Sequence, residues 1–201
     1  MKLVLASNNK KKLREMSDIL GKEGFEVVSM GQMGFDSDPD ENGETFEQNA
    51  FIKASAAVKI CNLPCIADDS GLEVKALGGR PGVHSARYCE GTDLDRTLHL
   101  LEEMKDKEDR EARFVSVVTC VFPDGSSVSA RGECKGEITR EIRGDGGFGY
   151  DPVFYVPEKG LTYAEMDEEM KNGLSHRGKA ISLFANLMKM RIDKGNDNAD
   201  K

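Results

Sequence analysis

The first half of the chain alternates short apolar runs with longer segments in which apolar residues recur every three or four positions. The runs at residues 3–6 (LVLA), 25–29 (FEVVS) and 64–67 (PCIA) are typical of strands. The two segments between them have the periodicity of helices. Their apolar faces consist of Leu13, Met16 and Leu20 in the first segment, and of Phe46, Ala50, Ala54, Ala57, Val58 and Cys61 in the second.

Local start signals support both helices. The polar residues 7–9 (SNN) are good N-caps for the first helix. Thr45 and Gln48 have the spacing of a capping box, in which each side chain binds the backbone of the other. The second helix then runs to about Cys61, because Pro64 cannot continue it.

A third helix opens the second half of the chain. It starts at Thr92 or Asp93, and we expect its leucine and methionine stripe to face the core. The stripe consists of Leu94, Leu98, Leu101 and Met104.

Strands then replace helices. Residues 113–122 and 127–131 form a hairpin around the turn at residues 123–125 (PDG), and residues 136–142 extend the sheet. A short helix over residues 163–171 has Met166 and Met170 inward, and a last helix begins after Ser175 with Ile181, Phe184, Leu187 and Met188 as its buried face. A βαβαβ order followed by a meander predicts an α/β fold with a mixed sheet.

Composition narrows the class of protein. With 201 residues, 38% of them hydrophobic, the chain forms a single domain or two lobes that share one core. Its net charge of −8 argues against nucleic acid as a partner, because binding nucleic acid requires neutralising phosphates. Five cysteines without a Cys-x-x-Cys pair fit a reducing cytoplasm, and three histidines argue against a zinc site. No run approaches the ~18 apolar residues of a membrane span, so we expect no membrane partner. The polar residues 195–201 are expected to form a disordered tail.

Two adjacent carboxylates, Asp68 and Asp69, follow the apolar run at residues 64–67 and precede Ser70 and Gly71. If the strand ends here, both acids lie at its end, where a ligand or a metal ion can reach them. If the strand continues, the two acids point to opposite faces, and only one of them can face a site fully. The alternative is a solvated turn.

Cations occupy the first turn of two predicted helices. Lys10, Lys11 and Lys12 begin the first helix, and His176 and Arg177 begin the last. The N-terminal end of a helix dipole is positive and disfavours cations, so an anion bound among them would explain both clusters. Backbone N–H groups and lysines at a helix start bind phosphate well. The P-loop spacing is absent, and a basic surface turn is the alternative.

Two further segments have residues that could bind parts of a nucleotide and its metal ion. Glu41 lies in an acidic loop at residues 36–44, which presents a carboxylate to a hard cation such as Mg²⁺ or is simply solvated. Phe148 lies between two glycines, where its ring can stack on a base or pack beside a tight turn. Together with the cationic helix starts, these features indicate a nucleoside triphosphate. A metal ion with a poised carboxylate suits hydrolysis at phosphorus.

The sequence resembles the inosine triphosphate pyrophosphatase family over about residues 2–187. The motifs that carry the resemblance stand in family order: LASNNKKKL, ENGETFEQNAFIKA, ADDSGLEVKALGGRPGVHSARY, GGFGYDPVF and SHRGKA. The resemblance implies one domain over residues 1–194, with an elongated mixed β-sheet flanked by helices and two lobes around a central substrate cleft. It also implies a cytoplasmic homodimer that uses Mg²⁺ to hydrolyse ITP, dITP and XTP to the monophosphate and pyrophosphate, which cleanses the nucleotide pool.

The resemblance assigns roles position by position. Asp69 matches the proton acceptor, and Glu41 and Asp69 match metal ligands. The residues matched to the substrate are Ser7, Asn8, Asn9, Lys10, Lys11 and Lys12 for the triphosphate, Ser70, the base-binding Phe148, Gly149, Tyr150 and Asp151, and Lys171, His176 and Arg177. We add Lys53, which can point towards the triphosphate from the second helix.

Three positions depart from the usual family pattern, and a separate residue, Arg177, bears on base selection. Asn8 and Lys11 stand where many relatives have glycine, and Asn42 stands where the usual residue is threonine. Arg177 can only donate hydrogen bonds, so we expect it to bind the 6-oxo group of ITP or XTP and to disfavour the 6-amino group of ATP.

Two other functions stay open. A Maf-like nucleotide pyrophosphatase resembles this fold but favours Ser-x-Arg-Arg after its first strand, where this chain has residues 7–10 (SNNK). A nucleotide sensor would bind without turnover, although a pure binder gains nothing from an acid pair near phosphates. Adjacency alone does not decide whether Asp68 or Asp69 is the base.

Overall fold

The computed structural model describes residues 1–7, 9–37 and 39–199. The strands are β1 (Lys2–Leu5), β2 (Glu26–Ser29), β3 (Cys65–Val74), β4 (Glu111–Val121), β5 (Ser127–Ile138), β6 (Phe154–Val156) and β7 (Leu161–Thr162). The α-helices are α1 (Lys10–Lys22), α2 (Phe46–Cys61), α3 (Asp93–Glu103), α4 (Glu168–Leu174) and α5 (His176–Ala199).

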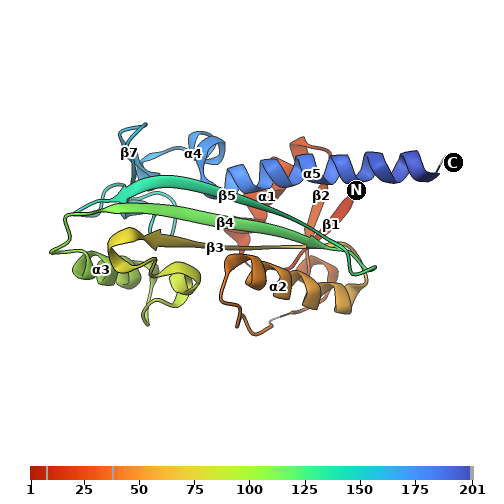
Figure 1. Cartoon of the computed structure of the whole chain (residues 1–201), viewed down its shortest axis with the longest axis horizontal. Helices are drawn as coiled ribbons and strands as arrows, with labels where there is room; N and C mark the ends of the chain where they lie inside the picture. Colours follow the sequence, from red (N-terminus) through yellow and green to blue (C-terminus); the bar gives the residue numbers. More distant parts are fainter. Residues whose placement is uncertain (8, 38, 200–201) are drawn as a thin grey trace. The chain divides into compact units, whose positions relative to one another are not determined.

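The strands of the described residues form one seven-stranded sheet in the order β2-β1-β3-β4-β5-β6-β7 (Figure 1). β1 pairs in parallel with β2 and with β3, whereas β6 is antiparallel to both β5 and β7. The predicted mixed sheet flanked by helices is therefore confirmed. The parallel part is the βαβαβ segment, because each parallel crossover requires a helix between its strands.

The chain divides into two compact units. Unit 1 comprises Met1–Asp69, Ser116–Gly132 and Arg177–Lys201, and unit 2 comprises Ser70–Val115 and Glu133–His176. Three strands, β3, β4 and β5, contribute residues to both units.

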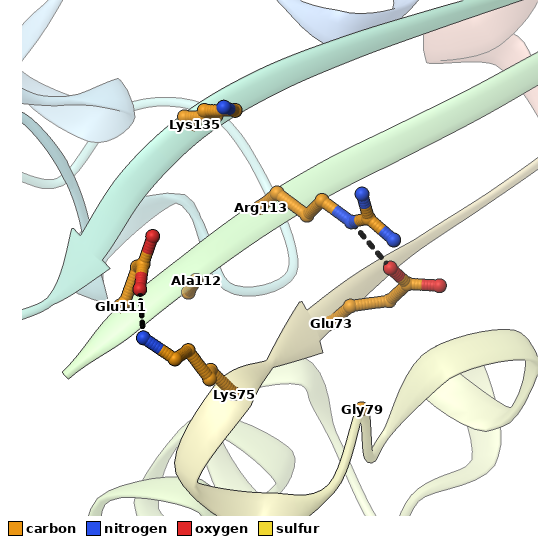
Figure 2. A pocket seen from close by; sticks show the side chains of 7 residues that line it. All are labelled: Glu73, Lys75, Gly79, Glu111, Ala112, Arg113 and Lys135. Carbon is orange, nitrogen blue, oxygen red and sulfur yellow. Dashed lines mark hydrogen bonds and ion pairs between the residues drawn. The ribbon is translucent and has the colours of Figure 1, made fainter. Parts of the chain in front are cut away.

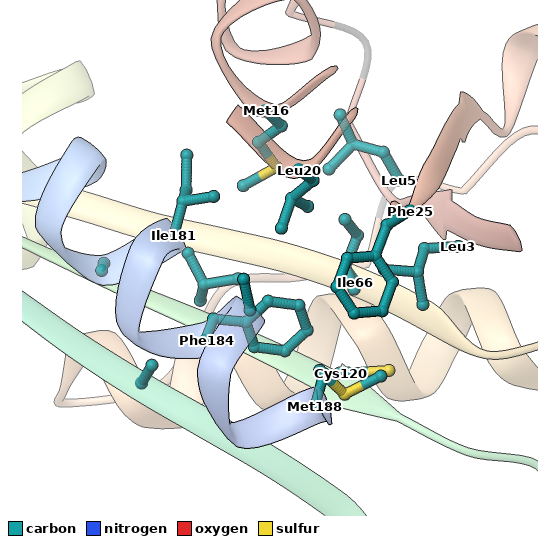
Figure 3. Packing of buried hydrophobic residues seen from close by; sticks show 14 residues of the cluster. Leu3, Leu5, Met16, Leu20, Phe25, Ile66, Cys120, Ile181, Phe184 and Met188 are labelled. Carbon is teal, nitrogen blue, oxygen red and sulfur yellow. The ribbon is translucent and has the colours of Figure 1, made fainter. Parts of the chain in front are cut away.

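The core of unit 1 covers both faces of β1. On one face α1 and α5 pack against the strands, as Figure 3 shows for Met16, Leu20, Ile181 and Phe184 around Leu3, Leu5 and Ile66. On the other face α2 packs through Ala57 against Val4 and Cys65. Burial on both faces explains why β1 reads as a continuous apolar run rather than an alternating one.

The core of unit 2 forms around aromatic residues of β4, β6 and the turn after β7. The ring of Phe114 meets Phe154 edge-on, with 4.7 Å between centroids, and Leu100 and Met104 of α3 belong to the same cluster. α3 begins as predicted, with Thr92 as its N-cap.

The predicted apolar stripe of α3 is partly wrong. Leu94 and Leu98 are 55% and 49% exposed, whereas Thr97 is buried. The hydroxyl of Thr97 lies 2.9 Å from the carbonyl oxygen of Asp93 and 3.2 Å from that of Gly149. A polar side chain whose hydrogen bonds are satisfied can be buried, and the bond to Gly149 satisfies Thr97 outside its own helix.

Other boundaries differ from the sequence prediction for local reasons. β5 is unbroken from Ser127 to Ile138. The helix predicted over residues 163–171 is a 3-10 turn followed by α4, because the side chain of Asp167 caps α4 by accepting from the amide of Met170 at 2.7 Å. Met170, predicted inward, is 38% exposed.

The last helix is longer than the sequence suggests. α5 includes residues 195–199, which the sequence predicts to be part of a disordered tail, and residues 200 and 201 lie outside the described residues. Across the described chain, no helix combines the length and the apolar character needed to cross a membrane.

Candidate active site

β3 does not end at the two acids, so the expectation of a strand end at Asp68 and Asp69 is wrong. The strand continues to Val74, and both carboxylates are buried within it. Asp68 accepts from Lys12 of α1, whereas Asp69 accepts from Lys53 of α2, and these helices pack on opposite faces of the unit 1 sheet. The strand persists because cations from both sides compensate the buried charges.

Asp68 lies at the centre of a buried ion cluster. Its Oδ2 accepts from Nζ of Lys12 at 3.0 Å and from Nε of Arg177 at 3.2 Å. Nη1 of Arg177 donates to Glu15 Oε2 at 2.6 Å. Burial favours the neutral form of Asp68, but the charges of Lys12, Arg177 and Lys53 outweigh it and lower the pKa of this carboxyl. Asp68 is therefore an ionised anchor for two cations.

Lys12 experiences the opposite balance. Burial, with Arg177 and Lys53 close by, lowers the pKa of its ammonium in spite of the ion pair with Asp68. An additional anion beside Lys12 would offset this effect, because an opposite charge favours the charged form.

Asp69 is held by two residues of α2. Nζ of Lys53 lies 2.8 Å from Oδ1, and Nδ2 of Asn49 lies 3.3 Å from Oδ2. Burial raises the pKa of Asp69, Glu41 adds to the increase, and Lys53 and Lys12 oppose it only in part. A buried carboxylate with a raised pKa is a better proton acceptor than an ordinary one.

Lys53 also joins Asp69 to the acidic loop. Its Nζ lies 3.3 Å from Oε2 of Glu41, so one ammonium contacts both predicted metal ligands. Burial alone would lower the pKa of Lys53, but Asp69, Asp68 and Glu41 together raise it. The lysine stays protonated and occupies a position that attracts cations.

The start of α1 is capped by Asn9. Its side chain accepts from the amides of Lys11 at 2.9 Å and Lys12 at 3.2 Å, and its own amide donates to Ser7 Oγ at 3.2 Å. Two of the N–H groups predicted to bind phosphate are therefore used by the cap. The side chains of Lys10 and Lys11 are exposed, and Lys12 reaches Asp68. Asn8 lies outside the described residues.

The predicted base-binding segment lies in unit 2, where three hydrogen bonds hold it, two from its backbone and one from a side chain. Asp151 Oδ2 accepts from the amide of Phe148 at 2.8 Å, the amide of Gly149 donates to Asp93 at 3.0 Å, and the hydroxyl of Tyr150 donates to the carbonyl of Ser85 at 2.9 Å. Gly149 has a φ of 60°, in the left-handed region that favours glycine. Three of the four residues thus hold the loop, and Phe148 remains half-buried.

Lys171 connects this loop to α4. Its ammonium lies 2.6 Å from Asp151 Oδ2, 4.8 Å from the centre of the Phe148 ring and 5.4 Å from that of Tyr163. His176 is buried and stacks on Phe114, with 4.6 Å between ring centroids. Lys171, Phe148 and Asp151 are therefore brought together, whereas His176 packs among core rings.

A hollow of about 340 Å³ in unit 2 is lined by none of the predicted site residues (Figure 2). Its lining is charged: Arg113 pairs with Glu73 at 2.6 Å, and Lys75 pairs with Glu111 and, at 3.3 Å, with Asp109. Ion pairs on an exposed surface satisfy one another, so this hollow is not assigned to the site.

Comparison with known protein families shows which family the chain belongs to. The sequence model of the Ham1 family matches residues 3–187. The chain belongs to the Ham1 family. A dITP/XTP pyrophosphatase of Desulforamulus reducens is 49% identical over 187 residues, covering 90% of this chain and 92% of that protein. A dITP/XTP pyrophosphatase of Thermus thermophilus is 48% identical over 184 residues, covering 90% and 88%.

Solved Ham1 structures have the same fold. A HAM1 protein from Coxiella burnetii matches with a TM-score of 0.88 at 40% identity, over 94% of this chain and 99% of that one. The Staphylococcus aureus Ham1 protein matches with a TM-score of 0.87 at 39% identity, over 95% and 100%. The family resemblance inferred from the motifs is confirmed.

Two residues of this Ham1 chain contact the predicted site but were missed by the sequence reasoning. Asn49 binds Asp69, and Glu15 binds Arg177. A signal for Asn49 exists, because it is an amide on the otherwise apolar buried face of α2, one turn before Lys53. Glu15 lies one turn after Lys12 in α1, but its partner is far away in the sequence.

The structure places two other Ham1 motif residues without testing their roles. Arg177 is buried with Asp68 and Glu15, in unit 1, and its contact with a 6-oxo group stays a prediction. Ser70 follows Asp69 in β3 and is half-buried.

Proposed function

We propose that this Ham1 protein hydrolyses purine nucleoside triphosphates with non-standard bases, namely ITP, dITP and XTP, to the monophosphate and pyrophosphate. Family membership and the names of the relatives, which are called dITP/XTP pyrophosphatases, support the substrate class. The observation that carries the chemistry is the grouping of Asp69, Lys53 and Glu41, in which a carboxylate of raised pKa lies beside a cation site.

The residues present fit a divalent cation. Among the described residues, no group of three or more His, Cys, Asp or Glu side chains is arranged to hold a metal ion. Mg²⁺ needs fewer protein ligands, since it is commonly bound by one or two carboxylates together with water and substrate phosphates. Glu41 and Asp69 already share one cation, the ammonium of Lys53. They would hold Mg²⁺, which supplies charge neutralisation at the phosphates and polarises the reacting phosphorus.

Asp69 is the residue that we assign as general base. Asp69 shares Lys53 with Glu41, and its pKa in the metal-free protein is raised, which favours proton transfer from water. Asp68 has a lowered pKa, and its Oδ2 is bound to both Lys12 and Arg177. The attack of that water on the α-phosphorus would release pyrophosphate. This proposal favours Asp69 over Asp68, between which the sequence alone does not choose.

Binding is assigned to residues of each unit separately. In unit 1, Lys12 supplies a charge for the triphosphate from the first turn of α1, where the helix has no acidic residue. In unit 2, Phe148 is assigned to stack on the base, on a loop fixed by Asp151 and Lys171.

The test is a product assay over a panel of nucleotides, with and without Mg²⁺. We expect one pyrophosphate and one monophosphate per dITP, ITP or XTP, and little turnover of ATP. Release of orthophosphate and a diphosphate would contradict the proposal. Binding without turnover would favour a nucleotide sensor, and turnover of modified pyrimidine nucleotides alone would favour a Maf-like enzyme.

We further propose a cytoplasmic homodimer. All five cysteines, Cys61, Cys65, Cys89, Cys120 and Cys134, are free thiols, which suits a reducing compartment. Light scattering of the purified protein tests the dimer, and a mass of one chain at micromolar concentration would contradict it.

A further inference from the structure

Asn49 is a fully buried amide whose two ends bind two different segments of the site. Its Nδ2 donates to Oδ2 of Asp69 in β3 at 3.3 Å. Its Oδ1 accepts from the amide of Gly43 in the acidic loop at 2.8 Å. A buried polar group is retained where its hydrogen bonds are satisfied, and here one bond leads to Asp69 and the other to the loop that carries Glu41.

Asn49 acts together with Lys53 one helical turn later. Lys53 takes the other oxygen of Asp69 at 2.8 Å and reaches Glu41, two residues before Gly43, at 3.3 Å. Because residues four apart lie on the same helix face, α2 holds the base with one pair of donors. The same two side chains hold the acidic loop, at Gly43 and at Glu41.

Gly43 fits this arrangement sterically. A Cβ on Gly43 would lie 2.7 Å from Oδ1 of Asn49 and 2.7 Å from Cβ of Gln48. The φ of Gly43 lies outside the left-handed region, so the close approach to α2, rather than backbone conformation, favours glycine here. Glu44 is bound in addition, because its amide donates to Gln48 Oε1 at 2.7 Å. In the predicted capping box this bond would go to the amide of Thr45, so Gln48 too serves the loop.

We propose that Asn49 is a positioning residue that sets the separation of Glu41 and Asp69 by tying the acidic loop to the base. The inference rests on the proposed function, since it assigns Asn49 to the carboxylate pair that would hold a divalent cation. Side chains that orient metal-binding groups typically change metal affinity or activity by about 10–100-fold when they are removed.

The experiment compares Asn49→Ala, Asn49→Asp and Gly43→Ala with the wild-type protein. Gly31→Ala is the matched control, because a Cβ on Gly31 meets only Ser29 Oγ, at 4.0 Å. Turnover of dITP is measured as a function of dITP and of Mg²⁺. Hydrogen exchange of the Gly43 amide is measured by NMR in metal-free protein. The amide of Gly125, which donates to the carbonyl oxygen of Phe122 at 2.9 Å, is the internal reference.

We expect Asn49→Ala to lower kcat about 10–100-fold and to raise the half-saturating Mg²⁺ concentration about tenfold. The KM for dITP should change by no more than about threefold, because Lys12 is intact. Exchange at Gly43 should be about tenfold faster, with Gly125 unchanged. Asn49→Asp keeps the acceptor for Gly43 and loses the donor to Asp69, so it should retain slow exchange and still lose kcat.

Gly43→Ala should reproduce the loss of kcat, and Gly31→Ala should behave as wild type. An active wild type with unchanged kcat and Mg²⁺ dependence in Asn49→Ala would overturn the inference. Should that variant fail to fold, unchanged kinetics in Asn49→Asp and Gly43→Ala would overturn it equally. A wild-type protein without Mg²⁺-dependent turnover would instead overturn the proposed function. Unchanged hydrogen exchange of the Gly43 amide in Asn49→Ala would by itself refute the proposal that Asn49 ties the acidic loop to Asp69.

Discussion

Asp68 and Asp69 are consecutive in β3, yet they bind cations on opposite faces of the unit 1 sheet. Asp68 accepts from Lys12 at 3.0 Å, and Asp69 accepts from Lys53 at 2.8 Å. Their pKa values move in opposite directions, down for Asp68 and up for Asp69. Environments that separate the pKa values of two neighbouring acids are how enzymes assign different roles to them.

Asp69→Asn should abolish turnover and leave the fold intact. Loss of a general base costs roughly 10²–10⁴-fold in rate. The carboxyl of Asp69 has a raised pKa when folded, so its stabilising contribution is present below its unfolded pKa, about 4, and is lost as pH rises through the folded value. In metal-free buffer the difference in Tm between Asp69→Asn and the wild type should therefore shift in favour of the variant as pH rises from about 4 to 8. A difference that shifts in favour of the wild type over this range would contradict this balance of burial and ion pairing.

Asp68→Asn should have the opposite effect on stability. It leaves Lys12 and Arg177 buried with a weaker partner, and breaking a buried pair costs about 3–5 kcal/mol. Because the folded pKa of Asp68 is lowered, its contribution is present above the unfolded value of about 4 and is lost as pH falls through the folded value.

The measurement is urea unfolding of Asp68→Asn between pH 7 and pH 3. The control is Asp18→Asn, because Asp18 pairs with Arg14 on an exposed face at 4.0 Å and such pairs contribute little. The difference between Asp68→Asn and wild type should shrink as pH falls below about 4. A difference that stays constant with pH would show that packing, not charge, makes Asp68 important.

Much of the fold could be predicted from the sequence because the signals are local. Residues 3–5 are buried on both faces, so their apolar run needs no knowledge of the partners. Asn9 and Thr45 cap α1 and α2 through bonds to amides two or three residues away. A cap is visible in sequence because both of its members lie within one helical turn.

The remaining features depend on contacts that no local pattern reveals. Thr97 replaces a leucine at the core face of α3 because its hydroxyl finds the carbonyl of Gly149, 52 residues away. Asn49 reaches Asp69 across 20 residues, and Arg177 reaches Asp68 across 109. The motifs predict which residues belong to the site, but the different surroundings of Asp68 and Asp69 follow from which helix packs on which face of β3.

Substituting the three lysines in the first turn of α1 one at a time should separate a phosphate contact from a basic surface. Lys12→Met should raise the KM for dITP about tenfold or more, because a hydrogen bond to a charged group contributes about 1.5–3 kcal/mol. Lys10→Met and Lys11→Met are measured for comparison, since both side chains are exposed, and a smaller rise in KM in these two variants would assign the phosphate contact to Lys12. The affinity for IMP should change less than that for ITP in Lys12→Met. Equal changes for IMP and ITP would show that Lys12 does not bind the phosphate chain.

Phe148→Ala should weaken the binding of every purine triphosphate by a similar factor. The loop that carries Phe148 is fixed by Asp151, whose carboxylate binds both the Phe148 amide at 2.8 Å and Lys171 at 2.6 Å, so removing the ring leaves the loop in place. Stacking contributes about 1–3 kcal/mol per base and does not distinguish base edges. We therefore expect kcat/KM for dITP, XTP and ATP to fall together, with the ratio of dITP to ATP unchanged. Phe51→Ala is the control, because Phe51 is 45% exposed on α2. A changed ratio in Phe148→Ala would mean that the ring takes part in base selection, and undiminished activity would remove Phe148 from the base site.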